Sequence, residues 1–195
     1  MGLTLIASKT APTDADSGEI RFADGEDSVV FDNTYKEYQF YFVNIHPETN
    51  GKDFEFQVND TGDPVASGGG FDVSEIVSTH TRAYHTEAGG GGSMEYRSGA
   101  DLANEAEYQL LQEWVGATDG TADDSGVSGV LTIYDPSSAY IKHFTARTSA
   151  MYDVTSSYDG LTAGYINDVT PIDEINFRMS ADAIDTGTIY MYGVS

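Results

Sequence analysis

Four histidines, His46, His80, His85 and His143, are the side chains in this sequence best suited to general acid–base or metal chemistry. His80 and His85 lie five residues apart in a segment that reads as extended. They should therefore point to opposite faces of a strand and chelate a metal poorly. His143 stands in a stretch typical of a strand face, and we expect it at the surface or in a subunit interface. The histidines predict no catalytic centre.

Two acidic clusters could hold Ca²⁺, an ion that prefers oxygen ligands. One spans residues 14–19, and the other includes Asp119, Asp123 and Asp124. Neither matches the twelve-residue calcium loop that closes on a glutamate. Solvated loop carboxylates are the alternative interpretation. We expect no cofactor, and calcium at Asp119, Asp123 and Asp124 is the one metal hypothesis.

Other catalytic motifs are missing from the sequence. It has no cysteine, which excludes disulfides, thiolate nucleophiles and cysteine-ligated zinc. It also has no Gly-x-Ser-x-Gly turn, no His-Glu-x-x-His pair and no glycine loop that ends in Gly-Lys-Ser/Thr. With 32 acidic residues, a carboxylate pair at glycosidase spacing could arise by chance in almost any fold. We expect the protein not to be an enzyme.

The excess of acidic over basic residues excludes some classes of binding partner. Nine basic residues against 32 acidic ones leave a net charge of −23. This charge argues against nucleic acid and against anionic membranes, because both bind proteins through Lys and Arg. No run approaches the roughly 20 apolar residues of a membrane helix, and the first residues lack the basic region of a signal peptide. We expect a soluble, uncleaved chain whose charge either suits salty water or keeps copies apart.

The dominant pattern along the chain is alternation with a period of two, which is typical of half-buried strands. Residues 53–59 place Phe54, Phe56 and Val58 on one face, and residues 36–45 become apolar on both faces, as in a central strand. Asn50-Gly51 between these two segments is a strong turn signal. We therefore expect them to form a hairpin.

Further strands are predicted at short spacing, separated by turn residues. Together with the hairpin they make about ten short strands, the signature of a sandwich or barrel. We expect an all-β, antiparallel β-sandwich, jelly-roll-like, with residues 1–195 as a single domain. The additional strands are expected at residues 3–7, 19–22, 71–82, 130–134, 139–148, 163–167, 174–180 and 186–194.

Residues 101–115 break this rule. Leu102, Ala106, Leu110 and Trp114 recur at helical spacing, acidic residues fill the first turn, and Gly116 follows the end. The segment predicts one amphipathic helix that lies on the sandwich, with the single tryptophan on its buried stripe.

The end of the chain also has an unusual pattern. Ile189 and Met191 alternate with Tyr190 and Tyr192, so both faces of the last strand are apolar or aromatic. We expect this strand inside the sandwich or at a subunit contact. Tyr190, Met191 and Tyr192, together with His143, are the predicted interface residues.

Four stretches of the chain resemble a family of virion structural proteins that is common in tailed bacteriophages, especially marine ones. They are residues 3–8, residues 35–47 with the pattern Tyr-x-x-Tyr…Asn-Ile-x-Pro, residues 172–180 with Ile-x-x-Ile-x-Phe, and residues 187–194 with Gly-x-Ile-x-x-Tyr-Gly. These motifs are structural rather than catalytic. The resemblance implies a β-sandwich, jelly-roll-like, that assembles in multiple copies on the phage particle.

The expected function is therefore that of a virion protein, a capsid decoration or cement protein on the exterior of the particle. Its expected partners are other virion proteins, either the major capsid protein or tail proteins, and further copies of itself, with a trimer as one form. The alternative is a tail fibre adaptor or a receptor-binding module that recognises host glycans. The sequence has no coiled-coil or collagen-like shaft, which argues against a long fibre.

Overall fold

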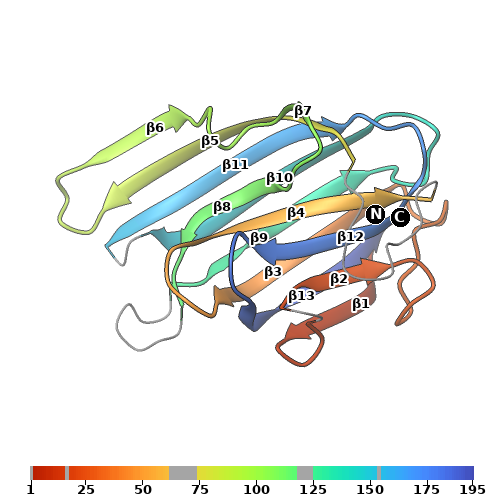
Figure 1. The fold of residues 1–195 in the computed structure, drawn as a ribbon, viewed down its shortest axis with the longest axis horizontal. Helices are drawn as coiled ribbons and strands as arrows, with labels where there is room; N and C mark the ends of the chain where they lie inside the picture. The colour runs from red at the N-terminus through yellow and green to blue at the C-terminus, as the bar shows by residue number, and fades with distance from the viewer. Residues whose placement is uncertain (1, 16–17, 62–73, 118–124, 153–154) are drawn as a thin grey trace.

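The computed structural model describes residues 2–15, 18–61, 74–117, 125–152 and 155–195. Within these residues the chain forms thirteen β-strands and no helix (Figure 1). The strands are β1 (Leu3–Ala11), β2 (Ile20–Ala23), β3 (Glu37–Pro47), β4 (Lys52–Asp60), β5 (Ile76–Thr86), β6 (Gly92–Tyr96), β7 (Ala103–Glu105), β8 (Gln109–Val115), β9 (Val127–Tyr134), β10 (Lys142–Tyr152), β11 (Ser156–Ile166), β12 (Ile172–Met179) and β13 (Ile184–Val194).

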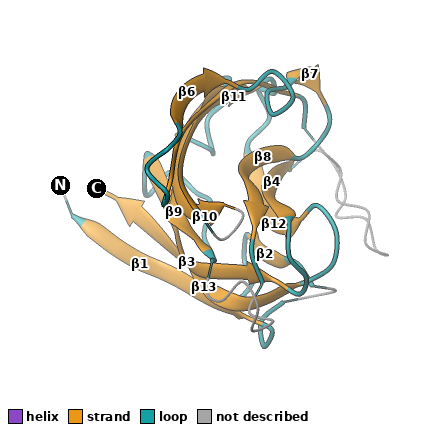
Figure 2. Ribbon diagram, turned by 90° about the vertical axis from the view of Figure 1, so that its left-hand side faces the viewer, coloured by secondary structure: helices purple, strands orange, loops and turns teal. Residues whose placement is uncertain are grey.

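The strands form two antiparallel sheets. The large sheet has nine strands in the order β1-β13-β3-β9-β10-β11-β5-β6, and β7 pairs with β5 beside β6. The small sheet has four strands in the order β2-β12-β4-β8. Figure 2 shows the large sheet curling around one face of the small sheet. The prediction of an all-β, antiparallel sandwich is confirmed.

Eight of the strands pair in an order that resembles one long hairpin wrapped around the core. The first strand, β1, pairs with the last, β13, and β2 pairs with β12. In the same way β3 pairs with β9, and β4 pairs with β8. The other strands, β5, β6, β7, β10 and β11, extend the large sheet beyond β9. The chain ends meet, because the Gly2 N–H donates to the Ser195 carbonyl at 3.0 Å.

Alternation along the strands determines which side chains fill the space between the sheets. Phe54, Phe56 and Val58 are fully buried, as the pattern of residues 53–59 predicts. The ring of Phe177 on β12 lies among four other phenylalanines, with ring centroids 5.3–6.3 Å apart. Two of these rings come from β3 of the large sheet and two from the small sheet; they are Phe40, Phe42, Phe22 and Phe54.

The predicted hairpin between residues 36–45 and 53–59 is wrong. β3 belongs to the large sheet and β4 to the small sheet, and the rings of Phe42 and Phe54 meet across the core at 5.0 Å. The turn itself is present: Gly51 has a φ of +76°, which glycine adopts without steric cost, and its N–H donates to the Val115 carbonyl at 3.0 Å. Turn residues specify a change of direction, but they do not decide which strand becomes the neighbour.

The predicted helix over residues 101–115 is also wrong, because β7 and β8 occupy this segment. Residues four apart share a face in a strand as well as in a helix, so the spacing of Leu102, Ala106, Leu110 and Trp114 fits both. Only β8 contributes to the core, through Leu111 and Val115. Trp114 is 51% exposed, so the tryptophan is not on a buried stripe.

Most of the other expected strands are present, with bounds that differ by several residues. The strand expected at residues 71–82 corresponds to β5, which begins at Ile76, and residues 71–73 lie outside the described part of the chain. The segment 163–167 is only the end of β11, and β6 starts in a glycine-rich stretch that reads as a loop. Glycine and serine have low strand propensity, and pairing with a neighbour overrides it here.

The contacts of Phe177 predict how much its side chain contributes to the free energy of unfolding. Phe177→Ala should lower the free energy of unfolding by about 3–5 kcal/mol, because it empties the space between four rings. Urea denaturation of both proteins measures this difference. Tyr140→Ala is the control: its ring is 77% exposed, and we expect a change within about 0.5 kcal/mol. Equal losses in the two variants would contradict this description of the core.

Candidate functional site

The structure places the four histidines in different surroundings. His80 is fully buried, with Nδ1 2.8 Å from Thr162 Oγ1 and Nε2 3.2 Å from Tyr158 Oη. His85 is exposed on the opposite face of β5, as predicted. His46 is buried beside the Gly116 carbonyl. His143 is exposed on β10, 6.2 Å from the ring of Tyr165. The described partners of His46, His80 and His143 are not histidines, and His80 and His85 lie on opposite faces of β5.

The predicted calcium residues Asp119, Asp123 and Asp124 lie outside the described part of the chain. In the other acidic cluster, residue 16 is also outside it, and the Asp14 carboxylate accepts a hydrogen bond from the Thr10 N–H at 2.7 Å. Among the described residues, no group of three or more histidines, aspartates and glutamates could hold a metal ion.

One group of charged side chains is largely withdrawn from water. Glu113 on β8 accepts hydrogen bonds from Arg82 at 2.8 Å and from Arg97 at 2.6 Å. The Tyr158 hydroxyl lies 3.4 Å from the same carboxylate, and burial raises the pKa of this phenol. Burial likewise lowers the pKa of the His80 imidazole beside it. These groups satisfy one another, and they tie β5 and β11 to β8.

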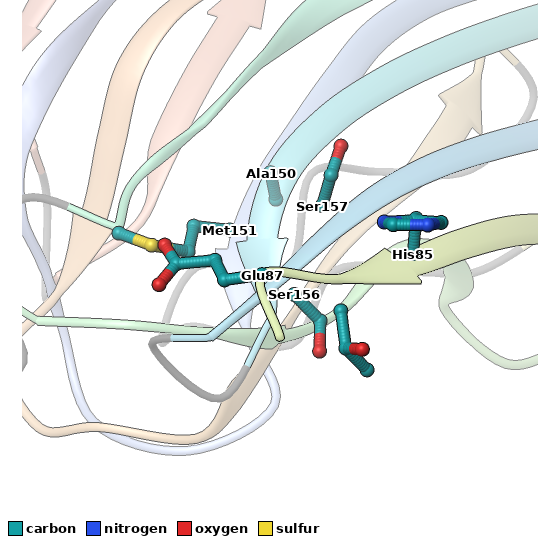
Figure 3. A pocket seen from close by; sticks show the side chains of 7 residues that line it. His85, Glu87, Ala150, Met151, Ser156 and Ser157 are labelled. Atoms are coloured by element: carbon teal, nitrogen blue, oxygen red, sulfur yellow. The ribbon is translucent and has the colours of Figure 1, made fainter. Parts of the chain in front are cut away.

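Figure 3 shows a shallow pocket of about 310 Å³ at the end of β5, β10 and β11. Its lining includes His85, Glu87, Ser156 and Ser157. The two serine side chains point to opposite sides in the figure, as neighbours in a strand do. His85 and Ser157 are cross-strand partners in the pairing of β5 with β11, and no hydrogen bond joins their side chains among the described residues.

The most distinctive surface is the outer face of β1, β13, β3 and β9, which we call the neutral face. The register of these four paired strands places sixteen side chains on this face, four from each strand. Of the sixteen, only Glu37 carries a formal charge. Charged residues make up 21% of the whole chain. The sixteen are Leu3, Leu5, Ser8, Thr10, Thr188, Tyr190, Tyr192, Val194, Glu37, Gln39, Tyr41, Val43, Ser128, Val130, Thr132 and Tyr134.

Apolar and aromatic side chains of this face reach solvent. Leu3, Leu5 and Val43 are 54%, 51% and 45% exposed. The rings of Tyr41 and Tyr192 meet edge to face, with centroids 5.5 Å apart. In Figure 2 this face of the large sheet points away from the small sheet, and no described strand covers it.

The polar groups of the neutral face bond to one another. The Tyr41 hydroxyl donates to Gln39 Oε1 at 2.9 Å, and Gln39 Nε2 donates to Glu37 at 2.5 Å. The hydroxyls of Thr10 and Thr188 lie 2.9 Å apart. Because these groups already have partners, less hydration is lost when another surface covers them.

The predicted interface residues divide between this face and the core. Tyr190 and Tyr192 are half-buried on the neutral face. His143 lies on the same side of the sheet, on β10. Met191 is fully buried, because it is the inward neighbour of the two tyrosines. The strand therefore lies inside the sandwich and also presents aromatic rings to solvent.

Sequence reasoning missed the other members of the neutral face. Leu3, Leu5 and Tyr41 stand in segments that we predicted as strands, and apolar residues on both faces of residues 36–45 were the available signal. That signal was interpreted as a strand buried on both sides. Which of its faces is covered depends on the small sheet.

The outer face of the small sheet is different, because it carries charges. Arg21 lies 3.2 Å from Glu174, and Arg178 lies 3.1 Å from Glu55. The Arg178 guanidinium also stacks 3.5 Å from the ring centroid of Tyr108. The outer face of the small sheet is thus ionic, whereas the outer face of β1, β13, β3 and β9 is nearly uncharged. Beside that neutral face, Arg147 of β10 pairs with Asp159 of β11.

Comparison with protein-family models, with curated proteins and with solved structures gives no match for this chain. No helix in the described part of the chain has the length and apolarity that crossing a bilayer would require.

Glu174 gives a pH-dependent prediction. Its side chain is 1% exposed, and burial raises its pKa above the usual 4.5 although Arg21 opposes the shift. Ionised Glu174 therefore destabilises the fold, most strongly above its folded pKa, and the penalty fades toward pH 4.5. Glu174→Gln should raise the melting temperature at pH 8 by a few degrees, and by less at pH 5.

The control is Glu26→Gln, which removes the exposed partner of the same Arg21. An exposed ion pair contributes about 0–1 kcal/mol, so we expect little change in the melting temperature at either pH. Thermal melts at the two pH values measure both variants. A melting temperature of Glu174→Gln below that of the wild type at pH 8 would mean that the ion pair outweighs the cost of burial.

Proposed function

We propose that this chain is a non-enzymatic structural protein of a tailed-phage virion, a decoration or cement protein on the capsid exterior. The observation that carries the proposal is the strand order, in which β1, β2, β3 and β4 pair with β13, β12, β9 and β8. We infer a jelly-roll-like arrangement from this wrapped hairpin with its two rows of four strands, and we interpret β5–β7 and β10–β11 as additions to one of its sheets. Jelly rolls build viral capsid proteins and lectins.

The positions of the resembling motifs support the virion family. Residues 3–8 lie in β1, residues 35–47 include β3, residues 172–180 include β12, and residues 187–194 lie in β13. These strands are members of the wrapped hairpin, and three of them form one end of the large sheet. Motifs at such positions contribute to the sheets rather than to a catalytic site, as we expect for a structural protein.

The distribution of charge supports a subunit that lies on a larger assembly. A net charge of −23 keeps most of the surface hydrated and apart from other acidic surfaces. The neutral face offers one broad region, built on a rigid sheet, where close contact brings few carboxylates together.

The buried ionisable groups Glu113 and His80 are held by structural partners.

The test is the copy number of this chain in purified virions, measured by quantitative mass spectrometry. Hundreds of copies per particle are expected for a protein that decorates a symmetric shell. About a dozen copies would instead place it in the tail, as the fibre-adaptor or receptor-binding alternative requires. Absence of the chain from the particle would overturn the proposal in both forms.

The charge gives a prediction for the purified protein. Repulsion among its carboxylates is long-ranged at low salt, since the Debye length falls from about 30 Å at 0.01 M to about 8 Å at 0.15 M. The melting temperature should therefore rise with NaCl, most steeply below 0.15 M. If the protein attaches through apolar contacts, its retention on the particle should rise as well.

A matched divalent series separates screening from binding. CaCl₂ and MgCl₂ at equal ionic strength should raise the melting temperature equally if only screening acts. A larger effect of CaCl₂ would indicate a specific calcium site, for which Asp119, Asp123 and Asp124 are the predicted residues. Release of the protein from its particle by added NaCl would contradict attachment through apolar contacts, and it would point to basic groups on the partner.

A further inference from the structure

We propose that the neutral face is the contact between two copies of this chain. The inference rests on the proposed function, in which many copies lie close together, and it names the partner of the surface described above. Its basis is that strongly acidic copies repel one another although the proposed function places them close together, and that contact through the neutral face reduces this repulsion.

Two copies of this chain repel each other over most of their surfaces. Each copy has 32 acidic and nine basic residues. At physiological ionic strength the Debye length is about 8 Å, so this repulsion is felt strongly at the separations of a protein contact. Of the sixteen side chains of the neutral face, only that of Glu37 carries a formal charge. Contact between two neutral faces thus brings few carboxylates together.

The same charges argue against a basic partner at this surface. A positively charged protein would be attracted to the acidic parts of the chain, where it could form ion pairs. The neutral face offers it a single carboxylate, and the Gln39 amide already donates to that group. A surface of the same neutral chemistry is the better match, and a second copy supplies one.

The side chains of the neutral face suit a contact that excludes water. Tyr41, Tyr190 and Tyr192 lie together on neighbouring strands, and Leu5 and Val43 stand exposed at their sides. Tyrosine is enriched where protein surfaces bury each other, because its ring is large and loses little conformational entropy. The edge-to-face contact of Tyr41 with Tyr192 further restricts both rings before any contact forms.

The size of the face is sufficient for a weak to moderate dimer. Four strands spaced about 4.8 Å apart, each about ten residues long at 3.3 Å per residue, cover roughly 600 Å² in projection. Two such faces bury roughly 1,200 Å² in total, which lies at the lower end for specific complexes. We therefore expect a reversible dimer in solution that high local concentration on a particle would strengthen.

A face that pairs with itself also gives a sensitive test, because one substitution enters the contact twice. Val43→Glu and Leu5→Glu each place a carboxylate on the neutral face at a well-exposed position. Val169→Glu makes the same change of charge at a position that is 59% exposed, lies between β11 and β12, and is not one of the sixteen residues of the face. Thermal melts of each variant identify any that does not fold.

The experiment is sedimentation velocity of the full chain from about 10 µM to about 1 mM in low and in physiological salt. The wild type should dimerise with increasing concentration, and NaCl should strengthen its association. Val43→Glu and Leu5→Glu should weaken the association at least tenfold, and Val169→Glu should resemble the wild type. Two variants at separate positions keep the test decisive if one of them fails to fold.

Three results would overturn the inference. The wild type could stay monomeric over the whole concentration range, or it could form an oligomer that neither Val43→Glu nor Leu5→Glu weakens. In the third, Val169→Glu weakens the association as much as the two variants on the face do. None of these results bears on the copy number in the virion. A monomer found in hundreds of copies per particle would reject the self-contact and leave the proposed function standing, whereas a dimer absent from the particle would do the reverse.

Discussion

The packing of aromatic rings between two unequal sheets is the interaction on which the rest of this structure depends. Phe177 belongs to the small sheet, and its ring contacts phenylalanines from both sheets. The chain crosses between the sheets several times, so neither sheet can form its inner face without the other. The small sheet has only four strands, and the large sheet curls around this narrow layer in Figure 2.

The strands that extend the large sheet have a second means of attachment besides their apolar packing. β5 and β11 lie beyond the rows of the wrapped hairpin, and polar contacts tie them to β8. Arg82 donates to Glu113, and Thr148 of β10 donates to the Leu111 carbonyl at 2.9 Å. A buried charge is costly unless it is paired, and the Glu113 carboxylate is paired with both Arg82 and Arg97. The polar network thus adds to the apolar packing of these strands, to which Ile76 of β5, Phe144 of β10 and Ile166 of β11 contribute.

Charge divides the outside of the molecule in a way that composition does not reveal. The outer face of the small sheet carries ion pairs such as Arg178 with Glu55, while the outer face of β1, β13, β3 and β9 is nearly uncharged. A protein of strong net charge needs no neutral face for its own folding. Exposed leucine and tyrosine there are better explained by a contact that the isolated chain does not make.

The alternation of residues determined by itself that the protein is an antiparallel sandwich and that Phe54, Phe56 and Val58 are in its core, because a strand sends successive side chains to opposite sides. It could not determine that β3 and β4 belong to different sheets, or that residues 101–115 contain strands, because a turn does not choose a neighbour and a spacing of four residues fits both a strand and a helix. The same limit applies to the candidate site: the sequence indicated Tyr190 and Tyr192, but Leu3, Leu5 and Tyr41 join them only when β1, β13 and β3 pair. Residues far apart in the chain become one surface through strand pairing, and that pairing is decided by which faces the whole fold can bury together.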